Sequence, residues 1–250
     1  MELLAILSST VLASVALASP LTLERRARNT ARLQIRIAQR HSNLPSKAGT
    51  NEILHLNETT HEEYSSNWAG AVLIGSGYTS VTGTFTVGID GDTCQSAILQ
   101  TGVDFCIDSS GTIFDAWYEW LPDYSHDFSG ISISAGDKVK VTVDASSKTT
   151  GTAIVENLTT GKTVSHTFTG QDDNALCETN AEWIMEDFSS FLSLVPFANF
   201  GTVTFTDISV TSGDSSVGAS NATIIDIQQN NKTLTSSSAS DNEVTIKYIG

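Results

Sequence analysis

The stretch Thr112–Trp120, T-I-F-D-A-W-Y-E-W, alternates in a way that predicts a β-strand. Successive side chains of a strand point to opposite faces of a sheet. Asp115, Trp117 and Glu119 would therefore share one face, opposite an apolar row of Phe114, Ala116, Tyr118 and Trp120. Such a strand indicates either the floor of a binding cleft or a surface strand whose acidic side chains face solvent.

Short alternating segments of this kind recur from Tyr64 to the C-terminus, between turns such as Gly91-Asp92 and Thr160-Gly161-Lys162. Gly, Ser, Thr and Val are plentiful and long helix-period stretches are scarce, so the pattern predicts an all-β sandwich or jelly roll. The predicted strands used below are Trp68–Ile74, Val81–Val87, Ser96–Gln100, Thr112–Trp120 and Ala181–Asp187.

The N-terminus has the features of a secretory leader. Leu3–Leu17 is apolar, and Ala16-Leu17-Ala18 fits a small-x-small cleavage site, so residues 1–18 are predicted to be a signal peptide. A membrane anchor is the alternative, but the apolar stretch is too short to span a bilayer comfortably. We therefore expect a secreted, extracellular protein with no membrane partner, in which residues 19–60 form a pro-segment and residues 61–250 form the folded domain.

Charge divides the chain into two unlike parts. Seven of the 13 basic residues lie between positions 19 and 50: Arg25, Arg26, Arg28, Arg32, Arg36, Arg40 and Lys47. Residues 51–250 carry six basic and 26 acidic residues, a formal net charge of −20, which excludes nucleic acid and anionic membranes as expected partners.

The basic pro-segment has two interpretations. Arg32, Arg36 and Arg40 are four residues apart, which places them on one face of a predicted helix. Such a segment would inhibit the acidic domain by docking at neutral pH and leaving when carboxylates are protonated. Alternatively, it would serve only in secretion or folding.

The common catalytic signatures are absent from the sequence: it has no G-x-S-x-G, no H-E-x-x-H and no Asp-Thr-Gly or Asp-Ser-Gly. A second acidic stretch is Ala181–Phe188, A-E-W-I-M-E-D-F, in which Glu182 and Glu186 share a face of a strand or neighbour each other on a helix. From the pattern alone they are either a catalytic carboxylate with its supporter or two solvated acids.

Several longer runs together resemble one family, the glutamic peptidases or eqolisins, which are secreted, mostly fungal, acid endopeptidases. The runs are Ser65–Ala71 (S-S-N-W-A-G-A), Gly88–Cys94 (G-I-D-G-D-T-C), Ala97–Gly102 (A-I-L-Q-T-G), Asp115–Trp120 (D-A-W-Y-E-W), Asn180–Ile184 (N-A-E-W-I) and Val195–Ala198 (V-P-F-A). Several motifs in a fixed order are far more specific than any one of them.

The resemblance implies an antiparallel two-sheet β-sandwich of jelly-roll or lectin-like type, with the active site on its concave face. It implies that Gln100 and Glu182 are the catalytic pair, acting on a peptide substrate without metal or cofactor. Residues that would line or support the cleft are Trp68, Asp90, Asp104, Trp117, Glu119 and Glu186. It also implies a Cys94–Cys177 disulfide with Cys106 outside it, and we expect a monomer.

The chain departs from the family pattern before Gly88. Family members have a Ser/Gly-rich loop and a further strand with a Trp where Val87 here joins Gly88 directly. Either the fold has adapted or the sequence reflects a misread exon boundary. Two other functions therefore stay open: an inactive paralogue, and a carbohydrate-binding or glycan-cleaving sandwich that uses Asp115, Trp117 and Glu119. Gln100 argues against the second, because glycoside hydrolysis calls for two carboxylates.

Overall fold

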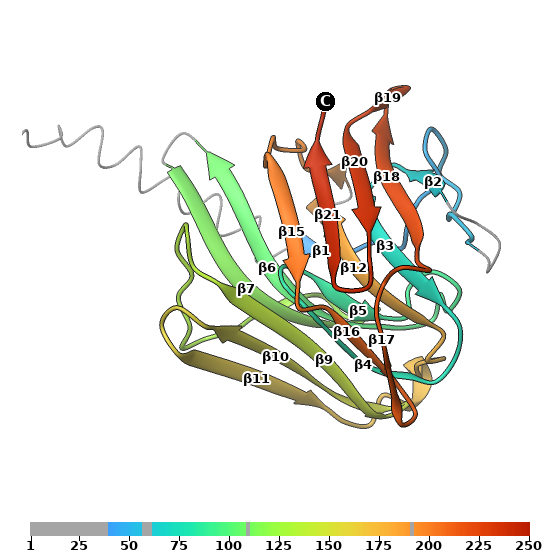
Figure 1. The fold of residues 1–250 in the computed structure, drawn as a ribbon, viewed down its shortest axis with the longest axis vertical. Helices are drawn as coiled ribbons and strands as arrows, with labels where there is room; N and C mark the ends of the chain where they lie inside the picture. Colours follow the sequence, from blue (N-terminus) through green and yellow to red (C-terminus); the bar gives the residue numbers. More distant parts are fainter. Residues whose placement is uncertain (1–39, 57–61, 109–110, 191–192) are drawn as a thin grey trace, which may run out of the picture.

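The computed structural model describes residues 40–56, 62–108, 111–190 and 193–250, and these residues form two packed layers of β-strands (Figure 1). This confirms the predicted antiparallel β-sandwich. Within the described residues, helical structure is limited to one 3-10 turn, η1 (Asp172–Asn174), and none of it is long and apolar enough to cross a membrane.

The first layer is a nine-stranded sheet. In spatial order its strands are β19 (Lys232–Thr233), β18 (Thr223–Gln229), β3 (Trp68–Ile74), β12 (Asn180–Glu186), β5 (Val87–Ile89), β6 (Ile98–Asp108), β7 (Gly111–Leu121) and β8 (His126–Asp127), with β2 (Glu62–Ser65) parallel to β18.

The second layer contains a six-stranded and a three-stranded sheet. The six strands are, in order, β11 (Lys162–Phe168), β10 (Thr150–Asn157), β9 (Val139–Ser147), β4 (Tyr78–Gly83), β16 (Ser209–Ser212) and β17 (Ser215–Val217). The three strands are β15 (Thr202–Thr206), β21 (Glu243–Tyr248) and β20 (Thr235–Ala239). Figure 1 shows β9, β10 and β11 along the lower edge, beneath β6 and β7.

Strand alternation decides which side chains enter the core between the layers. Ala116, Tyr118 and Trp120 of β7 pack into the main core with Ala181 and Trp183 of β12. Their sequence neighbours on the same strands point to the other face of the nine-stranded sheet. Burying the apolar row on one side therefore commits Trp117, Glu119 and Glu182 to the opposite, concave side.

Two predicted strand boundaries were wrong. The segment Val81–Val87 was predicted to be one strand, but it is divided between β4 in one layer and β5 in the other. Phe85 has φ 68°, a left-handed conformation that strand residues do not adopt, and the chain crosses between the layers there. Of the predicted strand Ser96–Gln100, only Ile98–Gln100 lies in a strand, the longer β6, which continues because β7 pairs with it along its whole length.

The direct join of Val87 to Gly88 produces a very short central strand rather than an exposed edge. β5 has three residues and pairs with β12 on one side and β6 on the other. The carbonyl groups of Phe85 and Thr86 accept hydrogen bonds from Val103 N and Ile184 N (3.0 and 3.2 Å), which extends this bridge by two residues. Beyond Thr86, β6 and β12 have no strand between them.

The segment predicted to precede the folded domain is in part packed against it. Residues 1–39, which include the predicted signal peptide as well as Arg32 and Arg36, lie outside the described residues. Arg40 and His41 form β1, which pairs with β13 (Ser189–Ser190), and β13 in turn pairs with β14 (Ser193–Leu194). At Arg40, therefore, the predicted helix is wrong, because the backbone here is held by strand pairing.

Candidate active site

A single row of cross-strand neighbours places the two predicted catalytic residues on one face. Gly88 of β5 pairs with Glu182 of β12 on one side and with Gln100 of β6 on the other. Val72 of β3 and Glu119 of β7 extend the row at its two ends. Because directly paired residues point to the same face, Gln100, Glu119 and Glu182 all face the concave side of the sheet.

Four residues further along the strands, a second row repeats this arrangement. Trp68 pairs with Glu186, and Asp104 pairs with Asp115. No β5 residue separates Glu186 from Asp104, since β5 begins only at Val87. A cavity of about 170 Å³ lies at this gap, lined in part by Arg40, Thr86, Val103, Phe105 and Met185. The sheet thus brings together all the predicted cleft residues except Asp90.

Within the first row, Gln100 and Glu119 are in direct contact. Gln100 Nε2 donates a hydrogen bond to Glu119 Oε2 at 2.9 Å, and both side chains are almost completely buried. Burial raises the pKa of Glu119, and the nearby Arg40 charge offsets part of that rise. Glu119 therefore fixes the orientation of the Gln100 amide.

Glu182 lies in the same buried row with one oxygen unsatisfied. Among the described residues nothing donates a hydrogen bond to its Oε2. Burial raises the pKa of Glu182 well above its ordinary value, and the nearby carboxylates of Asp92, Asp90 and Glu186 raise it further. A buried acceptor with no partner is uncommon in folded proteins and points to a position for water or substrate.

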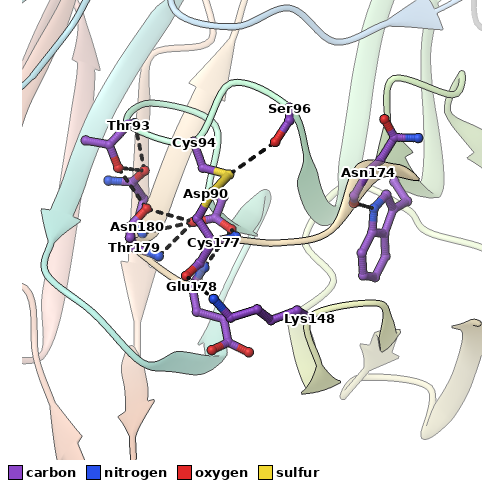
Figure 2. The surroundings of a disulfide bond; sticks show 11 residues. Asp90, Thr93, Cys94, Ser96, Lys148, Asn174, Cys177, Glu178, Thr179 and Asn180 are labelled. Atoms are coloured by element: carbon purple, nitrogen blue, oxygen red, sulfur yellow. Dashed lines mark hydrogen bonds between the residues drawn. A yellow bond between two sulfur atoms is a disulfide. The ribbon is translucent and has the colours of Figure 1, made fainter. Parts of the chain in front are cut away.

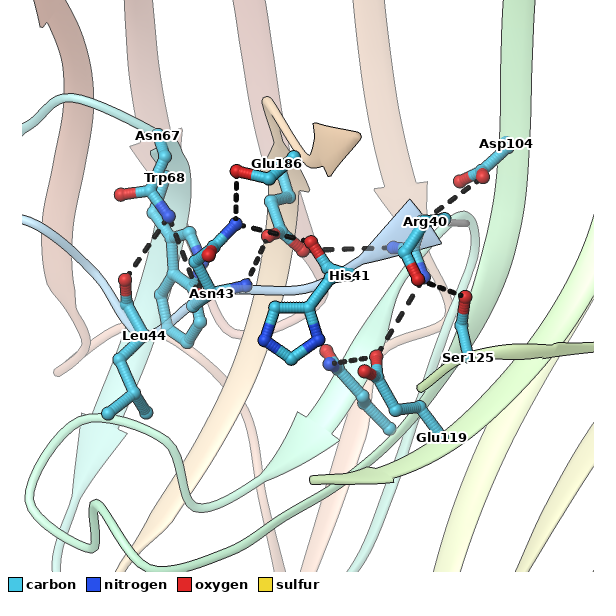
Figure 3. Close-up of polar contacts among 12 residues, drawn as sticks. Arg40, His41, Asn43, Leu44, Asn67, Trp68, Asp104, Glu119, Ser125 and Glu186 are labelled. Atoms are coloured by element: carbon cyan, nitrogen blue, oxygen red, sulfur yellow. Dashed lines mark hydrogen bonds and ion pairs between the residues drawn. The ribbon is translucent and has the colours of Figure 1, made fainter. Parts of the chain in front are cut away.

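Arg40 occupies the space between the carboxylates of the second row (Figure 3). Its Nε lies 3.1 Å from Asp104 Oδ2, and its two Nη atoms lie 3.9 Å from Glu119 and 3.7 Å from Glu186. The guanidinium carbon lies 3.4 Å from the centre of the Trp117 ring, a cation–π contact. Arg40 is 2% exposed, so one buried cation is shared among three buried acids.

The segment after Arg40 covers the rest of the concave face. Asn43 N donates to Glu186 Oε1 at 2.8 Å, and Trp68 Nε1 donates to Asn43 O at 2.9 Å (Figure 3). Leu54 and Leu56 are buried in a second apolar cluster with Trp68, Val72, Ile98, Leu121, Ile184 and Ile225. Residues 40–56 therefore lie over the predicted cleft.

Asp90 acts on a turn of backbone rather than on the catalytic pair. Its carboxylate accepts hydrogen bonds from the backbone N–H groups of Cys177, Glu178, Thr179 and Asn180, at 2.7 to 3.3 Å (Figure 2). This turn leads into β12, so Asp90 holds the strand that carries Glu182. The disulfide between Cys94 and Cys177 fastens the same turn, and Cys106 lies outside it.

In the described part of the chain, the one grouping with metal-ligand spacing is Asp90 with Cys94 and Cys177. Both sulfur atoms are already joined in the disulfide, and Asp90 already accepts several backbone hydrogen bonds. The concave face offers carboxylates, an amide and aromatic rings instead. This set suits proton transfer and hydrogen bonding to a polar, uncharged substrate group such as an amide.

Two participants were not anticipated from the sequence. The sequence shows Arg40 only as the last arginine of a basic run. Its contacts with three acids depend on the path of residues 40–56, which the sequence does not show. Asp92 is buried beside this site and accepts a hydrogen bond from Leu56 N at 3.2 Å. In the sequence, Asp92 was marked only as a member of the G-I-D-G-D-T-C run, with no role of its own.

Comparison with known proteins agrees with this geometry. Residues 85–248 match the Peptidase A4 family. The chain belongs to this family. The match confirms the resemblance to glutamic peptidases, and it places the chain among enzymes that hydrolyse peptide bonds.

Individual members of the peptidase A4 family are similar over nearly the whole chain. Aspergillopepsin-2 of Aspergillus niger is 53% identical, with 100% of each chain covered, and scytalidopepsin B of Scytalidium lignicola is 43% identical, with 98% of each covered. The crystal structure of scytalido-glutamic peptidase with a transition-state analog inhibitor matches with a TM-score of 0.69 and 46% identity, covering 74% of this chain and 98% of that one.

The alignment with aspergillopepsin-2 spans 285 positions, whereas this chain has 250 residues, so roughly 35 positions have no counterpart here. This agrees with the shortening expected before Gly88, where the structure has its three-residue strand and a connection of only Thr84–Thr86 from β4. The β-sandwich is therefore formed with a connection of only three residues between β4 and β5.

The buried acids predict an unusual dependence of stability on pH. Burial raises the pKa of Asp187 to about 7, with the Gln229 hydrogen bond offsetting part of the rise, and raises that of Asp92 to about 6. In the unfolded chain both ionise near pH 4. The folded state therefore keeps protons that the unfolded state has lost, and stability is highest near pH 4 and falls as pH rises through 6 to 7.

Asp187→Asn should remove part of this dependence. The difference in Tm between pH 4 and pH 8 should shrink by on the order of 5 °C, because each kcal/mol shifts Tm by a few degrees in a chain of this size. Calorimetry compares Asp187→Asn with wild type, and exposed Asp214→Asn is the matched control. A wild-type Tm that rises from pH 4 to pH 8 would contradict this interpretation of the buried acids.

Proposed function

We propose that the chain is a secreted, acid-active endopeptidase in which Glu182 and Gln100 carry out the chemistry. The observation that carries the proposal is the row through Gly88, which puts a carboxyl group and a primary amide on one buried face without a metal ligand set. Membership of the peptidase A4 family gives the reaction class.

Each member of the pair has a defined task in peptide hydrolysis. Glu182 takes a proton from the water that attacks the scissile carbonyl, then gives a proton to the leaving amine. The unsatisfied Oε2 of Glu182 is the position from which that water is held. Gln100 donates an amide N–H to the developing oxyanion. Because an amide does not titrate, this donor works in acid.

Supporting residues keep the pair in place. Glu119 orients the Gln100 amide through their 2.9 Å hydrogen bond. Asp90 and the Cys94–Cys177 disulfide fix the turn before β12. Trp68, Trp117, Asp104 and Glu186 line the cleft that an extended peptide enters when residues 40–56 are no longer over it.

The catalytic assignment predicts the outcome of two substitutions. After acidification to about pH 3.5, residues 19–250 should cleave an unfolded protein substrate, and Glu182→Gln or Gln100→Ala should lower kcat by about 100-fold or more, in the range of a lost oxyanion donor or general base. Exposed Glu243→Gln is the matched control and should retain full activity.

Full activity in both Glu182→Gln and Gln100→Ala would show that the pair is wrong. A silent wild type would instead favour the inactive paralogue. Secretion has a separate test, because the N-terminus of the exported protein should begin after Ala18 or further along. A product retained in the cell with residues 1–18 intact would contradict it.

We further propose that residues 19–60 inhibit the enzyme at neutral pH and leave in acid. Arg40 is the buried cation that lies among Asp104, Glu119 and Glu186. Burial raises the pKa of Asp104 to about 6 and that of Glu186 to about 8, with the Arg40 charge offsetting part of each rise. Because the Arg40 charge favours the ionised form of both acids, protonation of Glu186 as pH falls below its pKa of about 8 and of Asp104 below its pKa of about 6 removes the attraction that holds Arg40. Breaking a buried ion pair in this way costs several kcal/mol, so the segment leaves.

A peptide of residues 19–60, added to the acid-activated enzyme, should therefore inhibit it at pH 6 to 7 and lose its effect near pH 4. Arg40→Ala in the peptide should weaken inhibition by on the order of 100-fold, since truncating a buried charge costs about 3 kcal/mol or more. Lys47→Ala, at an exposed position of the same segment, should leave it unchanged. No inhibition at pH 6 to 7 would exclude an inhibitory role.

A further inference from the structure

Gly88 lies in the same row as Gln100 and Glu182, and its lack of a side chain affects where the Glu182 carboxyl can lie. Gly88 pairs directly with both Gln100 and Glu182, so it lies between them on the central strand β5. Two strand spacings separate the backbones of the pair by about 10 Å. For the carboxyl and the amide to act on one substrate bond, at least one of them must lean across β5.

The side chain of Glu182 does lean across. A Cβ built on Gly88 would overlap Glu182 Oε1 and would lie 3.1 Å from both Cδ and Cγ of the same side chain. The neighbours Val87 and Ile89 point into the main core, so residue 88 faces the cleft. The carboxyl group of Glu182 therefore rests over the backbone of Gly88, on the Gln100 side of its own strand.

Backbone conformation does not explain glycine at this position. Gly70 and Gly91 have φ values of 144° and 118°, which only glycine adopts readily, but Gly88 is not among the glycines with positive φ. An alanine would fit the backbone of β5 and would suit a strand better. A glycine inside a strand marks a place where another group approaches closely, and here that group is the Glu182 carboxyl.

We infer that Gly88 is a positioning residue for the reaction, because its missing side chain lets the Glu182 carboxyl reach the water and the carbonyl held beside Gln100. The inference rests on the proposed function of this pair. Gly88 touches neither reacting atom; it acts through Glu182. A methyl group at position 88 would displace the carboxyl from the row while leaving the strand pairing in place.

Gly88→Ala, made in the full chain and assayed after acidification to pH 3.5, should lower kcat by on the order of 100-fold with little change in KM, since a displacement of about 1 Å has effects of this size. The pH profile of kcat should also shift, because Glu182 would occupy a new environment. Gly151→Ala is the matched control: its Cβ would crowd Leu99 and Trp120 from the core side of the sheet, away from the pair.

A double-mutant cycle separates this role from a general packing defect. In a Glu182→Gln background Gly88→Ala should cause almost no further loss, because the group that it displaces is no longer a base. An equal fold-loss in both backgrounds, or an unchanged kcat and pH profile in the single variant, would overturn the inference while leaving the catalytic pair intact. Full activity of Glu182→Gln alone would instead overturn the proposed function.

Two outcomes need a measurement other than activity. If the wild type is silent, the Glu182 carboxyl is titrated by NMR, and its pKa should differ between wild type and Gly88→Ala but not between wild type and Gly151→Ala. If Gly88→Ala does not fold, Gly88→Ala with Glu182→Asp should fold, since the shorter side chain makes room. An unshifted titration, or a double variant that also fails to fold, would overturn the inference.

Discussion

The main physical constraint on this structure is that several acidic side chains are buried on one face of a sheet. Strand alternation puts an apolar row in the core, and the same periodicity forces Glu119, Glu182 and Glu186 together on the other side. A buried carboxylate must be paired, hydrogen-bonded or protonated. The chain uses all three solutions: Arg40 pairs with some acids, backbone N–H groups satisfy Asp90, and a pKa raised to about 7 keeps Asp187 protonated in acid. Each solution responds to pH in its own way.

The sequence predicted the layers well and the connections poorly. The face assignments of Thr112–Trp120 and Ala181–Phe188 were readable because period-two alternation is a local property. The split of Val81–Val87 was not readable, since it depends on the left-handed conformation of Phe85 and on which layer offers a partner. Arg40 was placed on a helix because a four-residue spacing also fits a helix, and only its pairing with Ser190 decides for a strand.

Predicting the candidate site from sequence would have required the register of the strands, and a local sequence pattern does not contain that information. Gln100 and Glu182 lie on strands far apart in sequence, and only their shared partner Gly88 shows that they form one row. Family motifs named both residues, but they did not show why glycine separates them. The short connection before Val87 has a local effect, because it leaves the row through Gly88 bridged by β5 and opens the sheet only at the second row, where Arg40 lies.

The proposed inhibition requires that Arg40 closes the acidic face while Asp104 is charged, and that the face opens when Asp104 is protonated. Crystal structures of the full chain carrying Glu182→Gln, determined at pH 7 and pH 4, test this requirement most directly. Arg40 should lie between Asp104 and Glu186 at pH 7, and at pH 4 the cleft should have neither Arg40 nor Leu56 over it. Finding Arg40 in the same contacts at both pH values would contradict the proposal.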